Sequence, residues 1–200
     1  MKKIIMILSL ICLTFVTSGY TAGYRPDITT IEAVKNSNHH NNMGTYYMRE
    51  KTYYAAIQEF KIAISLNPES QATAVYYTNL GECYMKIGYP QLALDCYERA
   101  LKIYNLNLNY YINYAKCIIA NGKTEEKLTQ FKDFSNPYNR LMSGVLYVEK
   151  GNYPDGITIL DGFTIEEPDL IITPAIKNYI KTSVKNMNSE PILPEGLTDL

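Results

Sequence analysis

Small residues recur at regular intervals through this chain, and each is followed seven positions later by a residue suited to a turn. The small residues lie 37, 34 and 29 positions apart, at Gly44, Gly81, Ala115 and Gly144. The turn positions are Lys51, Gly88, Gly122 and Gly151. Self-similarity at a period of roughly 20 to 50 residues is typical of repeat proteins, in which every unit is one supersecondary motif. We therefore predict four stacked units, each made of two helices joined by a turn.

The clearest unit extends from Ala74 to Asn107. It contains two amphipathic segments, AVYYTNLGECYMKIG and YPQLALDCYERALKIYN. Gly81 and Ala93 are small, which lets the paired helices approach closely, and larger side chains fill the seam: Leu80, Tyr84, Tyr97 and Leu101. A hairpin of this size cannot bury its apolar face alone, so we expect copies to pack on both sides.

This unit resembles the tetratricopeptide repeat. Its first helix has the spacing W-x2-L-G-x2-Y at Tyr77, Leu80, Gly81 and Tyr84. Its second helix has A-x3-F at Ala93 and Tyr97, so tyrosine replaces tryptophan and phenylalanine. The resemblance, which extends over about two-thirds of the chain, implies an all-α, right-handed α-solenoid of helix-turn-helix repeats. It also implies that the first helices line a concave groove for a peptide or helix of a partner protein.

We divide the repeat domain, residues 37–170, into units 37–70, 74–107, 108–136 and 137–170. A capping helix is expected within residues 171–188, from about Pro174 to Met187, because a solenoid must cover its last apolar surface. Residues 189–200 contain prolines, a glycine and acidic side chains and are predicted to form a flexible tail.

The third unit departs from the pattern in its second helix. Lys127 and Phe134 occupy positions where the repeat has alanine. A long side chain at a point of close contact should splay the helix pair or turn the second helix, so we expect a local kink in the superhelix. Thr124 is predicted to cap this helix, and Asn136 followed by Pro137 to begin the next unit.

The N-terminal residues have the three parts of a secretory signal peptide. A basic start, Met1–Lys3, precedes the uncharged apolar run 4–16, and small residues allow cleavage after Gly19 or Gly23. We predict a signal peptide over residues 1–23 and an exported protein of the bacterial periplasm or cell envelope. Residues 24–36 are a polar lead-in with a short helix at about 30–35. If the apolar run is not removed, it would tether the protein to the membrane.

The overall charge argues against a nucleic-acid or anionic-lipid partner. The chain has 19 Lys and Arg against 20 Asp and Glu, so it lacks the basic excess that such partners require. No nucleophile elbow, phosphate loop, zincin helix or dinucleotide fingerprint is present in the sequence. We predict that the protein is not an enzyme and uses no cofactor.

Histidine and cysteine also give no metal or redox motif. His39 and His40 are adjacent, so on a helix they point in different directions, and we predict no metal site. Cys83, Cys96 and Cys117 lack the short spacing of a zinc or redox pair. They are either small core residues or include one disulfide, and the sequence does not say which pair would form it.

The resemblance places a set of residues in the groove. The candidate partner-binding residues are Asn41, Thr45, Arg49, Thr78, Asn79, Glu82, Lys86, Asn109, Asn113 and Lys116. Asn41 and Thr45 stand where some members carry a lysine and asparagine clamp for a C-terminal carboxylate, so that clamp is broken here.

Two features of the groove leave alternatives open. An asparagine recurs at one position in successive units, at Asn42, Asn79 and Asn113. These amides either bond the backbone of a bound segment or bond water. In unit four the groove positions are apolar, and this strip is either a partner site or is covered by the last helix: Leu141, Val145 and Val148.

These observations predict a non-catalytic adaptor or scaffold of the cell envelope that binds another protein in the concave groove. An alternative is a membrane-tethered structural or assembly subunit with an uncleaved N-terminal anchor. A third hypothesis is a glycan or small-ligand binder that uses groove tyrosines. The sequence leaves the partner, the pathway and the oligomeric state open.

Overall fold

The computed structural model describes residues 26–189, and over this range the chain forms nine helices and no strand. The predicted signal peptide, the start of the lead-in and residues 190–200 of the predicted tail lie outside the described residues. The helices are α2 (Pro26–Arg49), α3 (Tyr53–Leu66), α4 (Gln71–Lys86), α5 (Pro90–Ile103), α6 (Leu108–Ala120), α7 (Thr124–Gln130), α8 (Pro137–Glu149), α9 (Tyr153–Glu166) and α10 (Thr173–Ser189).

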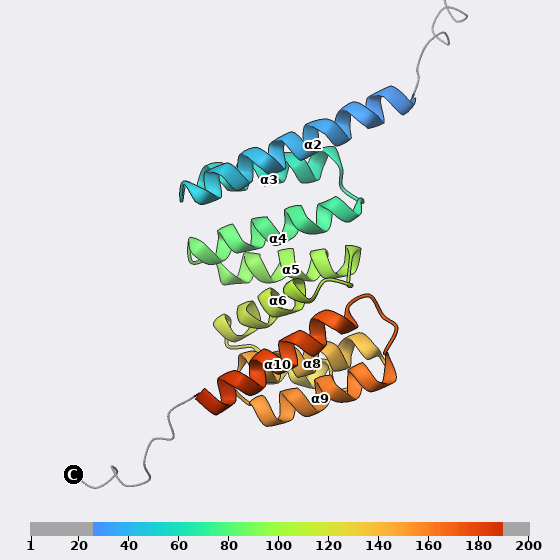
Figure 1. The fold of residues 1–200 in the computed structure, drawn as a ribbon. Helices are drawn as coiled ribbons and strands as arrows, with labels where there is room; N and C mark the ends of the chain where they lie inside the picture. The colour runs from blue at the N-terminus through green and yellow to red at the C-terminus, as the bar shows by residue number, and fades with distance from the viewer. Residues whose placement is uncertain (1–25, 190–200) are drawn as a thin grey trace, which may run out of the picture.

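Consecutive helices pack as hairpins, and the hairpins stack along one direction. Figure 1 shows this stack, from α2 and α3 at the top to α8 and α9 at the bottom, with α10 across the last hairpin. The pairs α2/α3, α4/α5 and α8/α9 make the most extensive contacts, and α10 packs mainly on α9. The predicted all-α solenoid is therefore confirmed.

The lead-in differs from its prediction, because α2 is one continuous helix from Pro26 to Arg49. The polar run after the predicted short helix is helical as well. Contacts with the next unit account for part of this: the Tyr76 hydroxyl donates to Asn38 Oδ1 at 2.6 Å and lies 3.3 Å from Ser37 Oγ. Polar side chains of α2 thus join this helix to α4.

All four predicted turn residues adopt the left-handed conformation. Lys51 has a φ of 59° and Gly88, Gly122 and Gly151 have φ values of 81°, 65° and 92°. In the second unit Gly88 N donates to Met85 O and Tyr89 N donates to Tyr84 O. The other three turns repeat this pair of bonds, which satisfies carbonyls left free at a helix end. One turn geometry therefore joins the two helices of every unit.

The predicted start of unit four is found, and two other predicted boundaries differ. Asn136 caps α8 by accepting from Tyr138 N at 2.9 Å, while Asn67 is the C-cap of α3 and Pro90 begins α5. Thr124 was predicted to cap α7, but it is the first residue of that helix. The N-cap is Lys123, and no side chain makes a capping hydrogen bond there. The first helix of unit two begins at Gln71, three residues before the predicted boundary at Ala74.

The recurring glycines lie where helices touch. An added Cβ at Gly44 would lie 2.6 Å from Phe60 Cε1, and one at Gly144 would lie 2.7 Å from Leu160 Cγ. At Gly81 the nearest atoms belong to the Tyr97 ring, at 3.0 Å. These distances leave no room for a larger residue unless the neighbour moves, which confirms the close-contact interpretation.

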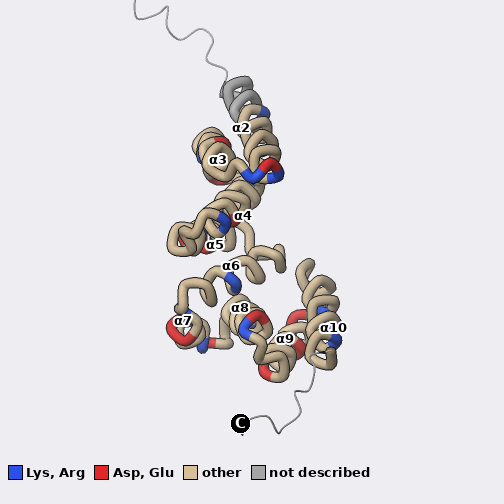
Figure 2. Tube along the Cα trace, turned by 90° about the vertical axis from the view of Figure 1, so that its left-hand side faces the viewer, with Lys and Arg blue, Asp and Glu red and all other residues tan. Residues whose placement is uncertain are grey.

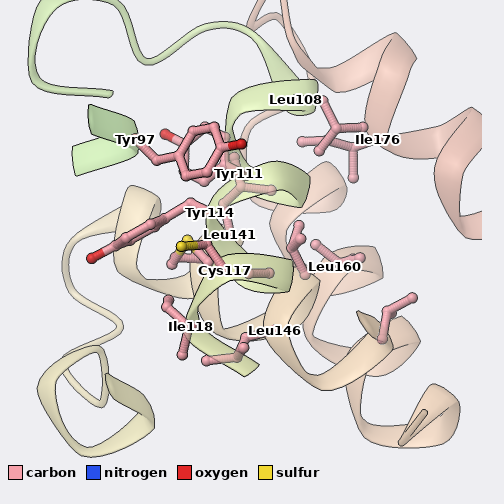
Figure 3. Packing of buried hydrophobic residues seen from close by; sticks show 14 of the residues in the cluster. Tyr97, Leu108, Tyr111, Tyr114, Cys117, Ile118, Leu141, Leu146, Leu160 and Ile176 are labelled. Atoms are coloured by element: carbon pink, nitrogen blue, oxygen red, sulfur yellow. The ribbon is translucent and has the colours of Figure 1, made fainter. Parts of the chain in front are cut away.

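One core cluster runs from α5 through α6 and α8 to α9 and α10. Figure 3 shows the rings of Tyr97, Tyr111 and Tyr114 beside aliphatic side chains of α8, α9 and α10 in this cluster. A smaller cluster joins α3, α4 and α5. Buried tyrosines keep polar partners for their hydroxyls: Tyr114 donates to Glu98, and Tyr111 donates to the Asn105 carbonyl at 3.0 Å.

The apolar strip of unit four belongs to this core. Leu141, Val145 and Val148 are buried in the cluster that also contains Ile172 and Ile176 at the start of the last helix. These three residues are therefore core residues and not groove residues, and their helix α8 packs mainly against α9 and α6.

The third unit is irregular, as its sequence predicts. The second helix α7 has seven residues, whereas α5 has 14. Lys127 is buried in α7, and Figure 2 shows this helix set to one side of the stack, while α6 packs directly against α8. Phe134 lies outside any helix, with the Arg140 guanidinium 5.7 Å from its ring centre.

Candidate functional site

The first helices of the units lie one after another and form one face of the stack. A side-chain bond joins two of them, because Asn79 Nδ2 donates to Asn41 Oδ1 at 3.1 Å. The Thr45 hydroxyl donates to the Asn41 carbonyl at 2.9 Å within α2. The amide of Asn79 thus has a partner inside the protein, which neither sequence alternative included. Asn42, the residue predicted to be equivalent, is exposed.

The predicted groove residues differ in accessibility. Thr78 is only 8% exposed and its hydroxyl donates to the Ala74 carbonyl at 2.9 Å, so it adds almost no surface. The exposed members are Arg49, Lys86, Asn109 and Lys116. The half-buried members are Asn41, Thr45, Asn79, Glu82 and Asn113.

A cleft of about 460 Å³ opens between α6 and α10. Asn109 and Ile112 line it from α6, and Ala175, Asn178 and Tyr179 line it from α10. The helix that was predicted only to cap the stack therefore also forms a wall of the groove. The residues of this wall were missed because nothing in the sequence of α10 relates it to α6.

A polar link fixes the relative positions of the helices around this cleft. Glu149 at the end of α8 accepts from the Tyr179 hydroxyl at 2.6 Å, and its other oxygen lies 3.8 Å from Lys116 Nζ. Partial burial and the Glu149 carboxylate both raise the pKa of Tyr179, so the phenol stays protonated and keeps donating. The link joins α6, α8 and α10, and of its members only Lys116 was predicted as a site residue.

The charges along this face are mixed. The first helices of the units carry both signs of charge: the basic residues are Arg49, Lys86 and Lys116, and the acidic residues are Glu82 and Glu149. Figure 2 shows acidic and basic residues scattered over the described helices, with no continuous basic stripe. This surface can bind a peptide by hydrogen bonds and apolar contacts, and its electrostatic selectivity depends on individual residues.

Histidine and cysteine occupy ordinary structural positions. His40 Nδ1 lies 2.6 Å from Glu59 Oε2, which ties α2 to α3. Within residues 34–189 no cluster of three or more histidine, cysteine, aspartate or glutamate side chains has a metal-binding arrangement. Cys83, Cys96 and Cys117 are free and buried, and burial raises the pKa of each thiol to about 12. They act as small core residues in this structure.

Two further observations concern the described residues. The α6 tyrosines Tyr110, Tyr111 and Tyr114 are buried, whereas Tyr179 of α10 lines the cleft. None of the helices in the described part of the chain has the length and apolar character needed to span a membrane.

Comparison with known proteins adds a family match and structural likenesses. A family model described as tetratricopeptide repeat matches residues 36–105, which fold as α2/α3 and α4/α5. No curated protein matches the sequence.

Several solved structures resemble the fold. The tetratricopeptide repeat domain of Arabidopsis OM64 is 14% identical, with 75% of this chain and 98% of that one covered and a TM-score of 0.43. YrrB, described as having an unusual peptide-binding site, is 22% identical over 71% and 74% of the two chains, with a TM-score of 0.43. Pseudomonas aeruginosa pilF is 14% identical over 78% and 71%, with a TM-score of 0.47.

The matched segment contains the two units with the clearest sequence spacing. The same turn geometry continues through the units that follow it. Residues 36–105 therefore match the tetratricopeptide repeat family, and they fold as two helix hairpins of the kind that the sequence predicts.

Proposed function

We propose that this protein is a non-catalytic adaptor of the cell envelope that binds an extended or helical segment of another protein in its concave groove. The observation that carries the proposal is the cleft between α6 and α10. Its walls combine the apolar Ile112 and Ala175 with the amides of Asn109 and Asn178. Amides can donate to and accept from a peptide backbone, while apolar walls bury partner side chains.

The groove is held in shape before a partner arrives. Asn79 joins α4 to α2, and Glu149 joins α8 to both α6 and α10. A preformed site loses little conformational freedom on binding, so more of the contact free energy contributes to affinity. These links favour a docking surface that is already formed in the free protein, and not one that forms only when the partner binds.

Site-specific cross-linking tests the location of the partner. A photoreactive benzoylphenylalanine at Asn109 or Asn178 should capture a protein partner in the cells that produce this chain. The same residue at Tyr54, an exposed position of α3, is the matched control and should capture much less. Equal capture at all three positions would place the binding site elsewhere.

A blocking variant gives an independent test. Ala175→Arg puts a long charged side chain into the cleft wall from an exposed position. It should weaken partner recovery at least tenfold, whereas Tyr54→Arg should leave recovery unchanged. Unfolding midpoints of both variants check that neither substitution disturbs the stack.

Export to the envelope rests on the N-terminal sequence alone. The basic start, the apolar run 4–16 and the small residues around Gly19 and Gly23 support removal of a signal peptide. Mass spectrometry of the protein isolated from its own cells tests this. Loss of residues 1–19 or 1–23 supports the free adaptor, and an intact N-terminus in a membrane fraction supports the tethered subunit.

A further inference from the structure

The short second helix of unit three leaves space in the stack. Helix α7 has seven residues, where α3, α5 and α9 have 14 each. After Gln130 the chain continues without helix until α8 begins at Pro137. A cavity of about 290 Å³ lies here between α5, α6, the end of α7 and α8. Figure 2 places α7 and α10 on opposite sides of the stack, so this cavity is separate from the α6–α10 cleft.

Aromatic and apolar side chains form the floor of this cavity, which we call the α7 cavity. Tyr111, Tyr114 and Met142 line it and are buried. Tyr138 and Phe131 line it from half-buried positions. A flat ring can pack against tyrosine and phenylalanine rings in offset or edge-to-face arrangements.

The rim of the α7 cavity is made of amides. Gln130 is exposed, while Asn105 and Asn139 are half-buried, and all three line the opening. The amides of Gln130 and Asn105 each supply a donor and an acceptor, and Asn139, whose Nδ2 donates to the Asp133 carbonyl at 3.1 Å, supplies an acceptor. A few polar groups around a mostly apolar pocket are the usual composition of a small-molecule site, where they fix the orientation of the ligand.

The charges at the inner wall already pair with each other. Lys127 Nζ lies 2.6 Å from Glu98 Oε1 and 5.7 Å from the centre of the Tyr114 ring. The Tyr114 hydroxyl donates to the same carboxylate oxygen. Glu98, which lines the cavity, is therefore already paired with a cation and offers little to a cationic ligand. An anionic ligand would face Glu98, and the exposed Lys102 at the rim would attract it only weakly.

We propose that the α7 cavity is a binding site for a small, uncharged, planar ring compound of about the size of indole. The ring packs against the aromatic floor, and a polar group at its edge bonds the amides at the rim. This site is independent of the proposed adaptor function, since it lies away from the groove helices' exposed face.

A titration with indole tests the proposal on the full chain. Indole should cause saturable nuclear magnetic resonance shifts of the Gln130 and Asn139 side-chain amides, with a Kd of about 1 mM or tighter. Benzoate and benzylammonium have similar size but opposite charges, and each should bind at least fivefold more weakly. Equal binding of all three probes would overturn the assignment to uncharged compounds.

A blocking variant with a matched control completes the test. Gln130→Trp places an indole ring at the rim, where it can enter the cavity, and Gln58→Trp places the same ring on an exposed part of α3. The natural chain has no tryptophan, so the fluorescence of each variant reports one ring. Gln130→Trp should emit at shorter wavelength than Gln58→Trp and bind indole at least tenfold more weakly than the natural chain.

The opposite result is equally clear. Shifts that rise linearly with indole concentration, and that are the same in the natural chain and both variants, would mean that the α7 cavity is only a hydrated gap left by the short helix. Partner capture at Asn109 would not be affected by that outcome, so the two proposals fail separately.

Discussion

Units two and three begin alike and end differently. Their first helices, α4 and α6, both carry a small residue in the interior and end in the same left-handed turn. In unit two Ala93 is fully buried against the first helix, and α5 continues for 14 residues. In unit three the equivalent residue is Lys127, and α7 ends after seven. The second helices of the two units thus differ at the position of close contact, which holds alanine in the regular unit and lysine in the irregular one.

We attribute the irregular second helix of unit three to Lys127, because a buried charge needs a partner of opposite charge. An ammonium group is too costly to bury without an opposite charge. Lys127 forms an ion pair with Glu98 on α5, the second helix of unit two. Helix α7 itself makes few contacts with α6 and α8. The remaining contact between units is made by α6 against α8, so the stack continues without a full second helix.

Moving the lysine into unit two is expected to have the largest effect. Ala93→Lys would bury an ammonium group where Ala93 is now completely enclosed. We expect a loss of about 3–5 kcal/mol in the free energy of unfolding, or no folded protein. Urea unfolding followed by circular dichroism measures it. Leu92→Lys, at the exposed neighbouring position, is the control and should change stability little. A well-folded Ala93→Lys would show that this position does not decide the geometry of the unit.

In unit four the residue equivalent to Ala93 is Gly156, and the two helices of that unit leave no room there for a Cβ atom. A Cβ at Gly156 would lie 2.8 Å from Val148 N and 2.9 Å from Gly144 O, both backbone atoms that cannot move alone. Gly156→Ala should therefore lower the free energy of unfolding by about 2 kcal/mol, although alanine is normal in units one and two. Gly162→Ala in the same helix meets no atom within 4 Å and should raise it by about 0.5–1 kcal/mol. Thermal unfolding compares the pair, and equal effects would contradict the tight contact.

Replacing Lys127 separates its charge from its shape. Partial burial raises the pKa of Glu98, but the bonds from Lys127 and Tyr114 and the lysine charge outweigh this, so the net pKa is lowered. Lys127→Met should cost about 1 kcal/mol near pH 7, a modest value because water partly reaches Glu98. Lys127→Ala should cost more, since it also removes packing.

This effect has a defined pH dependence. Because the folded pKa of Glu98 is below its ordinary value of 4.5, the ion pair contributes fully above that value and less as the pH falls through the folded pKa. Unfolding free energies of the natural chain and Lys127→Met should therefore converge in acid. A constant difference from pH 7 to pH 3 would assign the loss to packing alone.

The smallest expected effect is at the turns. Lys51 adopts a φ of 59°, a conformation that three other units give to glycine. Lys51→Gly should stabilise the fold by about 0.5 kcal/mol, because glycine has no Cβ to clash in this region. Gly88→Lys, the reverse exchange in unit two, should destabilise it by about 1 kcal/mol. Differential scanning calorimetry can resolve the two, and a stabilising Gly88→Lys would contradict the explanation.

Spacing in the sequence was enough to predict the repeats. The turns at Lys51, Gly88, Gly122 and Gly151 and the contacts of Gly44, Gly81 and Gly144 follow from local rules of helix ends and helix packing. Asn136 with Pro137 likewise predicted the start of α8. These features depend on a few neighbouring residues, so one sequence contains the needed information.

The features that were missed depend on residues far apart in the chain. The Lys127–Glu98 pair spans 29 positions and the Tyr179–Glu149 bond spans 30, and no local pattern marks either one. The burial of Leu141, Val145 and Val148 depends on how α8 packs against α6 and α9. The side chains that bury them come from other helices, so the sequence left this strip with two alternatives.

The Glu149 link also has a mechanical consequence. Because α10 packs mainly on α9 and bonds to α8 through Tyr179 and Glu149, the separation between α10 and α6 depends on how unit four holds this helix. A shift of this terminal helix would change the width of the α6–α10 cleft. Because Ile176 of α10 is buried in the main core cluster, the same shift would also alter the packing of the last unit, so the cleft width and the stability of the stack are coupled.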